Sequence, residues 1–407
     1  MELNSLVCTG CGSLCDDIRL GRDESGPVRI ENACAKGAAH IQSSFKAERR
    51  PKSTIRGEEC TPDRAIEEAK SLLFNSRGPS VFGLDNSTLS AQALAIQLAE
   101  KMGGTIDDAS SFSYGPLIKA ILEGVLPTCS LSEIKDNAGL LLYWGSDPPN
   151  THPRHLSLHS YYAYTEYDPA GWYPRVTMAC VDVRRTELSA MCRSTFEIKP
   201  GEDVALMTTI AGEGQDKAEM AERFTALVEK SRFCVVFAGL GLIHGLSGDL
   251  GPLVRMVQIL GKSARLAVIP MVPEINMRGF CKLLHQKTGQ VNSVSFGGGA
   301  TVSREHSFLE RVAKQPPECI LIIGADPFSA LPHSVVKNLA NAKIICLSPF
   351  TTPSTMTADV VVPTALPGVE CGGTVERMDG VEVTLAEIEK GPYPTEEAVL
   401  RQLLESV

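Results

Sequence analysis

Short, continuous apolar runs recur along this chain, and segments with helical spacing of Ala, Ile and Leu separate them. Continuous apolar runs are typical of strands that are buried on both faces, as in parallel sheets. Strands that alternate with amphipathic helices predict an α/β fold with doubly wound, mainly parallel sheets. The strand candidates are residues 79–84, 139–145, 176–183, 233–239, 264–270, 319–325 and 343–349. The first clear helix is predicted at 62–75, with Thr61 or Asp63 as its N-cap.

Two of the predicted strands end in the same way. Residues 139–148 read GLLLYWGSDP and residues 318–327 read ECILIIGADP, so each strand leads into Gly-x-Asp-Pro. A glycine at the carboxyl end of a strand lets the backbone approach a ligand closely, and open α/β sheets bind ligands at this edge. The repeat predicts two related, nucleotide-binding-like halves. Chance similarity between two ordinary α/β units is the alternative.

Composition excludes several classes of protein. The chain has 407 residues, of which 43% are hydrophobic and 21% are charged, as in a globular α/β protein with a substantial core. Its net charge of −9 argues against a general nucleic-acid-binding surface. No apolar run reaches the roughly 18 residues that a transmembrane helix requires, and the N-terminal residues lack the pattern of a signal peptide. We therefore expect a cytoplasmic protein that binds neither nucleic acid nor membranes.

The order of segments along the chain predicts three domains, one of them discontinuous. Residues 1–55 hold a cluster of cysteines and are rich in turn-forming residues, so they are expected to form a small metal-cluster domain. Residues 56–150 and 300–395 are expected to form the first α/β domain, and residues 151–299 the second. A chain of this length is long enough for two or three domains.

Four of the 13 cysteines are clustered near the N-terminus. Cys8, Cys11 and Cys15 form C-x2-C-x3-C, and Cys34 follows in the segment ACAKG. Four thiolates on tight loops can each ligate one iron of a [4Fe–4S] cluster, and four cysteines also suit tetrahedral zinc. Zinc ribbons usually have two C-x2-C knuckles, and this cluster has one, so its spacing favours the iron–sulfur cluster. The other cysteines are expected to pack as small hydrophobic residues in a reducing compartment.

The cysteine spacing, with a lysine two residues after the last cysteine, resembles that of the molybdopterin oxidoreductase superfamily. In that superfamily the lysine lies between the iron–sulfur cluster and the pterin, and Lys36 stands at its position. The two Gly-x-Asp-Pro segments resemble the superfamily's two pterin-dinucleotide strands, and residues 196–206 and 358–380 resemble two of its later segments. The resemblance implies cofactor-binding roles for Lys36, Gly145, Asp147, Asp182, Gly324, Asp326 and Thr374.

A narrower resemblance runs from about residue 5 to about residue 395. The segments CTGCGSLCDDI, WGSDPPNTHPRHLS, EINMRGF and PTALPGVECGGTVERMDG resemble the B subunit of formylmethanofuran dehydrogenase. This family interconverts CO2, formate and formylmethanofuran in one-carbon metabolism. The resemblance implies two related Rossmann-like domains, a small Cys-rich N-terminal domain, and a bis-pterin dinucleotide that holds tungsten or molybdenum besides the [4Fe–4S] cluster.

The resemblance also implies partner subunits. Full-length members of the superfamily end in a β-barrel domain that covers the pterins, and this chain ends soon after the segment PTALPGVECGGT. In the dehydrogenase family a separate D-type subunit supplies that barrel. We therefore expect this chain to lack the barrel and to assemble with other subunits, including one of the D type.

Two positions at the expected reaction centre depart from the family. Redox-active B subunits have a cysteine or selenocysteine that ligates the metal, followed by a histidine. Ser113 and Tyr114 stand at these positions here, and an alkoxide is a harder ligand than a thiolate. A B-like subunit that is thought to be redox-silent occurs in the formyltransferase/hydrolase complex of aerobic methylotrophs. The chain is therefore either a dehydrogenase subunit or such a structural subunit, and a zinc-stabilised α/β binding protein is the remote alternative.

Arg278 is a third candidate for the reaction centre. It lies in the segment NMRGF, and it resembles an active-site arginine of the family. Its planar guanidinium could hold a carboxylate such as formate. The alternative is an ordinary ion pair at the surface or in the core.

Overall fold

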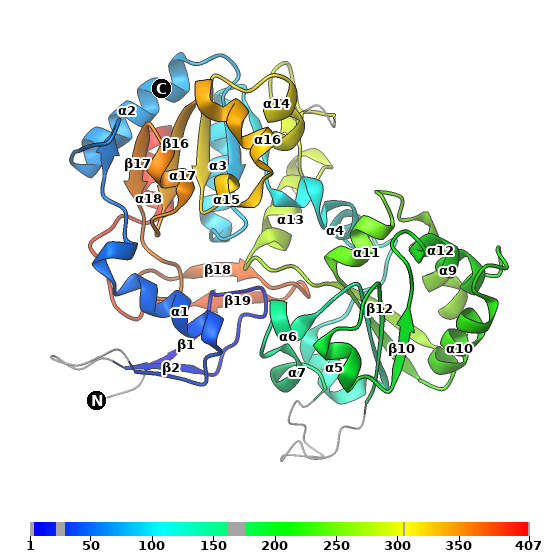
Figure 1. Cartoon of the computed structure of the whole chain (residues 1–407). Coiled ribbons are helices and arrows are strands. Elements are labelled where there is room, and N and C mark those ends of the chain that lie inside the picture. Colours follow the sequence, from blue (N-terminus) through cyan, green and yellow to red (C-terminus); the bar gives the residue numbers. More distant parts are fainter. Residues whose placement is uncertain (1–3, 22–28, 162–175, 304–305, 406–407) are drawn as a thin grey trace. The chain divides into compact units, whose positions relative to one another are not determined.

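The computed structural model describes residues 4–21, 29–161, 176–303 and 306–405. The chain divides into two compact units (Figure 1). The first unit comprises Met1–Phe112, Glu274–Arg377 and Glu382–Val407. The second comprises Ser113–Pro273 and Met378–Val381.

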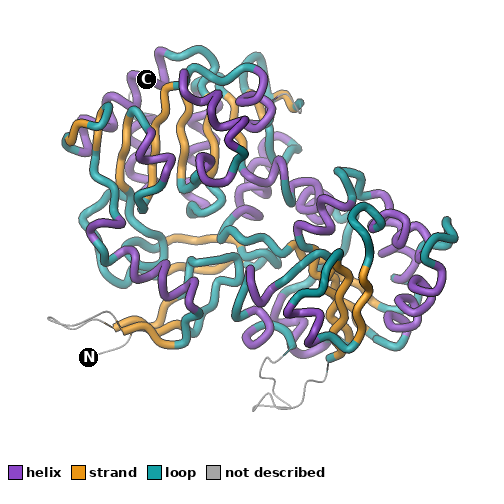
Figure 2. The backbone as a smooth tube through the Cα atoms, viewed as in Figure 1, coloured by secondary structure: helices purple, strands orange, loops and turns teal. Residues whose placement is uncertain are grey.

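A nine-stranded sheet forms the centre of the first unit, in the order β14-β13-β7-β6-β15-β16-β17-β4-β5. The strands are β4 (Thr54–Ile55), β5 (Glu58–Glu59), β6 (Ser80–Gly83), β7 (Thr105–Asp107), β13 (Val294–Ser295), β14 (Thr301–Val302), β15 (Cys319–Ile323), β16 (Lys343–Ser348) and β17 (Val360–Pro363). The five strands from β7 to β17 are parallel. Short antiparallel hairpins close both edges (Figure 2).

Helices cover both faces of this sheet because its strands are apolar on both faces. In β15, Leu321 and Ile323 belong to one hydrophobic core, and Ile320 and Ile322 belong to another. The first core lies under α2 (Pro62–Asn75), α3 (Leu89–Lys101), α13 (Met277–Thr288) and α18 (Glu396–Leu404). The second lies under α14 (Phe308–Lys314), α15 (Pro327–Ala330), α16 (His333–Val336) and the 3-10 helix η4 (Lys337–Asn341). The predicted helix at 62–75 is confirmed, and Thr61 caps it by accepting from the Arg64 N–H.

The N-terminal segment forms a small layer of its own within the first unit. Its antiparallel sheet consists of β1 (Asn4–Leu6), β2 (Ile18–Gly21) and β3 (Arg29–Glu31). Helix α1 (Ala35–Ser44) and the 3-10 helix η1 (Ala47–Arg49) follow. The unit also contains η2 (Ala109–Phe112), α17 (Pro353–Thr357) and a hairpin of β18 (Gly373–Glu376) and β19 (Glu382–Leu385).

The second unit has one sheet of five parallel strands, in the order β10-β9-β8-β11-β12. The strands are β8 (Leu140–Trp144), β9 (Thr177–Asp182), β10 (Ser194–Glu197), β11 (Phe233–Ala238) and β12 (Arg265–Pro270). The helices are α4 (Gly115–Leu122), α5 (Leu131–Asn137), α6 (Pro148–Thr151), α7 (His155–Leu158), α8 (Glu187–Met191), α9 (Asp203–Ile210), α10 (Ala218–Glu229), α11 (Leu240–Gly245) and α12 (Gly251–Leu260).

The parallel cores of the two units have matching strand orders. The strands that lead into Gly-x-Asp-Pro, β15 and β8, are central in the series β17-β16-β15-β6-β7 and β10-β9-β8-β11-β12. The predicted class, two related α/β units with mainly parallel sheets, is confirmed. The unit boundaries differ from the predicted domains, because β8 pairs with β9 and β11. Residues 113–150 therefore belong to the second unit, and residues 274–299 belong to the first.

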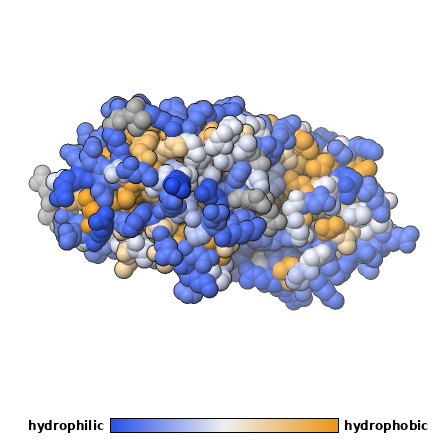
Figure 3. Space-filling view, turned by 90° about the horizontal axis from the view of Figure 1, so that it is seen from above, coloured by the Kyte–Doolittle hydropathy of each residue, from blue (hydrophilic) through white to orange (hydrophobic). Residues whose placement is uncertain are grey.

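The surface shown in Figure 3 is mainly hydrophilic, with separate hydrophobic patches. No helix among the described residues combines the length and the apolar character that crossing a membrane demands. All thirteen cysteines are described, and none of them forms a disulfide.

Candidate cofactor-binding site

Three of the four expected cluster ligands share one loop. Cys8, Cys11 and Cys15 lie between β1 and β2, and all three are buried. The Cys8 N–H donates to the Cys15 carbonyl over 2.8 Å, which closes the loop. Leu14 has a φ of 45°, so the backbone turns sharply just before the last cysteine. The loop thus holds three thiols within a few residues of each other.

The fourth thiol comes from the start of α1. Cys34 is the N-cap of this helix, and its Sγ accepts from the Gly37 N–H over 3.4 Å. A Cβ on Gly37 would lie 2.8 Å from the Cys8 Sγ and 3.7 Å from the Cys34 Sγ. Gly37 therefore allows the loop and the helix to meet at two of the expected ligands.

The four cysteines are suited to a cluster by residue type and by loop placement. Among residues 4–21, 29–161, 176–303 and 306–405, no group of three or more His, Cys, Asp or Glu side chains is placed to hold a metal ion. The ligand set therefore stays a prediction, supported by the loop and the helix start that bring these cysteines into one layer.

Lys36 lies in the first turn of α1 and is exposed. Its charge acts on two neighbours. Burial, and then the nearby Lys36, lower the pKa of His40 to about 4. Burial raises the pKa of Glu274 to about 6, and Lys36 opposes this shift. The expected cofactor lysine thus has a histidine and a carboxyl group near it in the first unit.

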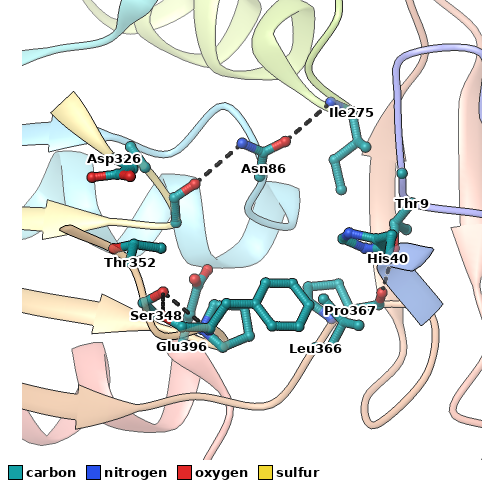
Figure 4. A pocket seen from close by; sticks show the side chains of 15 residues that line it. Thr9, His40, Asn86, Ile275, Asp326, Ser348, Thr352, Leu366, Pro367 and Glu396 are labelled. Atoms are coloured by element: carbon teal, nitrogen blue, oxygen red, sulfur yellow. Dashed lines mark hydrogen bonds between the residues drawn. The ribbon is translucent and has the colours of Figure 1, made fainter. Parts of the chain in front are cut away.

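A cavity of about 300 Å³ lies at the carboxyl ends of β15 and β16 (Figure 4). The cysteine loop and α1 contribute Thr9, Gly10 and His40, and the two strand ends contribute Gly324 and Ser348. The other lining residues are Asn86, Ile275, Ala325, Asp326, Pro349, Phe350, Thr352, Leu366, Pro367 and Glu396. The cavity is therefore at the edge where open α/β sheets bind ligands, beside the expected cluster loop.

Asp326 is held by the protein itself. Its Oδ1 accepts from the backbone N–H of Ser354 over 3.0 Å and from the Ser354 hydroxyl. Its Oδ2 accepts from the Ser329 hydroxyl over 2.5 Å. Asp326 is also the N-cap residue of α15. These bonds fix the turn after β15 and give the carboxylate a structural role in the cavity wall.

Glu396 is the carboxyl group that remains available in this cavity. Its side chain comes from the start of α18 and is 5% exposed, and its Oε2 has no hydrogen-bond partner among the described residues. Burial raises its pKa to about 8, against an opposing contact with Ser87. Sequence reasoning missed this residue, since a Thr-Glu-Glu helix start resembles any exposed N-terminus.

The corresponding turn in the second unit is filled by the chain itself. A Cβ on Gly145 would lie 2.2 Å from the backbone nitrogen of Leu242, and the Gly241 N–H donates to the Gly145 carbonyl over 3.0 Å. Asp147 accepts from Asn150 over 2.8 Å, and its other oxygen is buried without a partner in the described part of the chain. Asp182 ends β9, and burial raises its pKa. The three expected residues therefore meet at one sheet edge.

The segment before Ser113 carries buried carboxyl groups. Burial raises the pKa of both Asp85 and Asp108, and the neighbouring Asp85 adds to the rise at Asp108. Burial raises the pKa of Asp107 to about 6, although the Phe308 N–H donates to it over 2.6 Å. Neither the pair nor Asp107 was singled out from sequence.

Ser113 and Tyr114 follow this acidic segment at the start of the second unit. Ser113 is partly exposed, and Tyr114 is buried at 3% exposure as the N-cap residue of α4. The burial of Tyr114 supports a packing role for its ring. The structure thus places the two residues side by side at a helix start.

Arg278 is tied to a buried carboxylate. It lies in the first turn of α13, and its Nε donates to the Glu376 Oε1 over 3.1 Å. Lys282 donates to the Glu376 Oε2 over 2.6 Å. Thr374 lies two residues earlier on β18, where it pairs with Thr384. The buried ion pair between Arg278 and Glu376 matches the alternative expected for Arg278, an ordinary ion pair in the core. The pair fixes the orientation of the guanidinium.

Comparisons with known proteins agree with the fold. No protein-family model matches the chain. The chain is 27% identical, over 429 residues, to the B subunit of the tungsten-containing formylmethanofuran dehydrogenase 2 of Methanocaldococcus jannaschii, covering 100% of this chain and 98% of the relative. It is 26% identical to the protein of the same name from Methanococcus maripaludis, over 95% of this chain and 94% of the relative.

A solved structure shares the fold. It is a chain of the formyltransferase/hydrolase complex from Methylorubrum extorquens, determined in complex with methylofuran. The TM-score is 0.68 at 20% sequence identity, and the match covers 87% of this chain and 98% of that chain. The curated matches extend over nearly the full length of both proteins, as the resemblance of the separate motifs predicts. The chain is a relative of the B subunits of formylmethanofuran dehydrogenases.

Proposed function

We propose that this chain is the B subunit of a formylmethanofuran dehydrogenase-type complex in methanofuran-dependent one-carbon metabolism. The observation that carries the proposal is the similarity to two dehydrogenase B subunits over at least 94% of each relative. The shared fold of the formyltransferase/hydrolase chain agrees with it. All three are named as parts of multi-subunit enzymes, so the proposed activity belongs to a complex.

The first part of the proposal is a [4Fe–4S] cluster on Cys8, Cys11, Cys15 and Cys34. The common layer of the loop and α1, and the close approach at Gly37, support it. The cluster would transfer electrons, and Lys36 would place a positive charge beside it. Zinc on the same thiols is the alternative, because zinc also accepts four thiolates.

Iron analysis tests this part. Protein purified without oxygen is expected to contain about four irons and four labile sulfides per chain. The variant Cys34→Ser is expected to lose iron, and Cys192→Ser, a matched change in the second unit, is expected to retain it. Stoichiometric zinc without iron in the wild-type protein would contradict the cluster.

The second part is a pterin dinucleotide cofactor with tungsten or molybdenum. The relatives are tungsten-containing enzymes by name. In the first unit, Gly324, Asn86 and Phe350 would bind the cofactor in the cavity of about 300 Å³, with Glu396 as a polar partner. The metal would supply two-electron chemistry at a one-carbon substrate. Asp182 and Gly145 are the proposed binding residues of the second unit.

Ser113 separates two versions of this function. If the chain is redox-active, the Ser113 oxygen replaces the usual thiolate at the metal and must lose its proton. Tyr114 is a poor proton carrier near neutral pH, because a tyrosine has an unperturbed pKa of about 10. In the second version the chain is a structural subunit, and formyl transfer and hydrolysis occur on its partners. The fold shared with the formyltransferase/hydrolase chain is compatible with both.

A D-type β-barrel subunit is the proposed partner that completes the cofactor site. The described residues contain two α/β units and small antiparallel sheets. Affinity purification of the tagged chain from its own cells is expected to recover this partner. A monomer that recovers no companion would contradict the complex.

Activity of the native complex decides between the two versions. Dye reduction with formylmethanofuran, together with bound tungsten or molybdenum and loss of activity in Ser113→Ala, would establish the redox-active subunit. Formyl transfer and hydrolysis without dye reduction, unchanged in Ser113→Ala, would establish the structural subunit. Absence of every one of these activities from the complex would overturn the proposed function.

A further inference from the structure

A groove of about 720 Å³ lies at the amino ends of the strands of the second unit, opposite the Gly-x-Asp-Pro edge. Residues at the starts of β8, β9 and β10 and one face of α10 line it. Because the proposed cofactor residues of this unit, Gly145, Asp147 and Asp182, lie at the carboxyl ends of its strands, this groove has no part in the function proposed above.

The charge of the groove is of one sign. Arg193, Arg223, Lys230 and Arg232 line it, and no carboxylate of the described residues does. None of these four cations has an ion pair within the described part of a chain whose net charge is −9. The C-terminal end of α10 favours a cation at Lys230, but Arg193 and Arg232 precede strands and have no such explanation.

A second groove in the first unit provides a contrast. It has a volume of about 410 Å³ and is lined by Arg56 and Arg64 together with Glu58, Glu59 and Glu68. Arg56 pairs with Glu68 over 3.3 Å. The cations of that groove are balanced by carboxylates of the same chain. In the groove of the second unit, by contrast, the four cations have no such balancing carboxylate among the described residues.

Three further features of the basic groove suit an anion. The Arg223 guanidinium stands 5.6 Å from the ring centroid of the buried Phe196, which holds the cation over the groove. The Ser231 Oγ is buried and has no hydrogen-bond partner in the described part of the chain. The half-buried Leu227 adds apolar surface between the cations. An anion with several oxygens and some apolar surface would satisfy all of these groups.

We propose that this groove binds an acidic peptide segment of another subunit of the complex, through its side-chain carboxylates. An extended acidic chain matches an open groove with four separate cations and an apolar floor, because carboxylates and apolar side chains alternate readily along a peptide. The identity of the partner rests on the proposed complex. The ability of the groove to bind an anion does not depend on that complex.

Peptide binding tests the groove on the full-length chain. Fluorescein-labelled hexaglutamate is expected to raise its anisotropy on binding and to lose affinity as salt increases. The double variant Lys230→Gln/Arg232→Gln is expected to bind roughly tenfold more weakly, at about threefold for each exposed cation. Equal binding by the wild-type and double-variant chains, or none at low salt, would overturn the proposal. Tripolyphosphate binding without hexaglutamate binding would overturn it in favour of a phosphate site.

The matched control removes two charges that the chain itself balances. Arg255 pairs with Glu213 over 2.9 Å, and Arg265 pairs with Glu133 over 2.5 Å. The double variant Arg255→Gln/Arg265→Gln is expected to bind hexaglutamate as the wild-type chain does. A similar loss in this control would show that binding follows net charge alone, and would overturn the groove as a specific site.

A crosslinking experiment in the native complex identifies the partner. A photoreactive amino acid in place of Ala226, which lines the groove, is expected to crosslink to an acidic segment of another subunit. A crosslink to a neutral or basic segment, or none in an intact complex, would overturn the assignment. This failure differs from failure of the proposed function, in which no active complex would be recovered at all.

Discussion

The two units share a strand order and a turn, and they differ in what lies against that turn. Gly324 and Gly145 have φ values of 59° and 56°, and the following Asp326 and Asp147 have φ values of −133° and −126°. In the first unit the turn borders a cavity of about 300 Å³. In the second unit the backbone of residues 239–242 packs directly on the glycine.

The difference comes from the loop that follows the neighbouring strand. In the second unit, β11 leads through Gly239 directly into α11, so the helix start occupies the space beside the turn. In the first unit, β6 is followed by a loop before α3, and the Asn86 side chain reaches the Gly324 carbonyl over 3.1 Å. A local motif thus sets the backbone of its own turn, and the adjacent loop decides whether a cavity is present.

Alanine at the two glycines gives the largest expected contrast. A Cβ at position 145 would lie 2.2 Å from backbone, whereas at position 324 the nearest atom is the Ser87 Oγ at 3.4 Å. Gly145→Ala is expected to destabilise the chain by roughly 4–5 kcal/mol, from overpacking and left-handed backbone together, and Gly324→Ala by about 1–2 kcal/mol. Urea unfolding measures both. Equal losses would show that the second turn is not packed as described.

The second-largest expected effect is a dependence of the chain's stability on pH. Burial raises the pKa of Glu396 to about 8 in the folded chain, and an exposed glutamate in the unfolded chain has a pKa of about 4.3. The folded state therefore retains a proton that the unfolded state releases, and stability falls as pH rises from about 4.3 through about 8. The expected loss between pH 5 and pH 8 is roughly 3 kcal/mol.

Glu396→Gln is expected to remove most of this slope, because the amide does not titrate. The matched control is Glu397→Gln, which changes the adjacent residue of α18, where the carboxylate accepts from the Thr88 hydroxyl. The control is expected to retain the slope of the wild-type chain. Thermal unfolding at a series of pH values measures all three proteins. An unchanged slope in Glu396→Gln would assign the pH dependence to other carboxyl groups.

The two aspartates give the smallest effect. Asp326 accepts three hydrogen bonds from Ser329 and Ser354, and Asp147 accepts one from Asn150 and is 3.8 Å from Arg184. Asp326→Asn is expected to destabilise the chain by about 1.5 kcal/mol, and Asp147→Asn by less than about 0.5 kcal/mol. Chemical unfolding measures both. The reverse order would indicate that Asp147 has the structural role and that Asp326 is available for a ligand.

Much of the fold was predictable from sequence because it depends on local patterns. The apolar runs at 139–145 and 319–325 became buried strands, and Thr61 capped the helix that begins at Pro62. The unit boundaries were less predictable. Residues 113–150 joined the second unit because β8 pairs with strands that lie later in the chain. Pairing partners are set by packing over long distances in sequence, which periodicity does not record.

Sequence alone determined the strand and helix pattern, the Gly-x-Asp-Pro turns and the grouping of Cys8, Cys11 and Cys15 on one loop. These features depend on neighbouring residues, so the order of amino acids is sufficient to predict them. Only the tertiary structure shows that the Asp326 carboxylate accepts three hydrogen bonds from within the chain. It also shows that Glu396, 70 residues later, places a carboxyl oxygen without a hydrogen-bond partner among the described residues in the same cavity. It also gathered into one groove four cations that have no ion pair among the described residues. Burial and the distance to the nearest partner give these groups their properties, and both arise only when distant segments pack together.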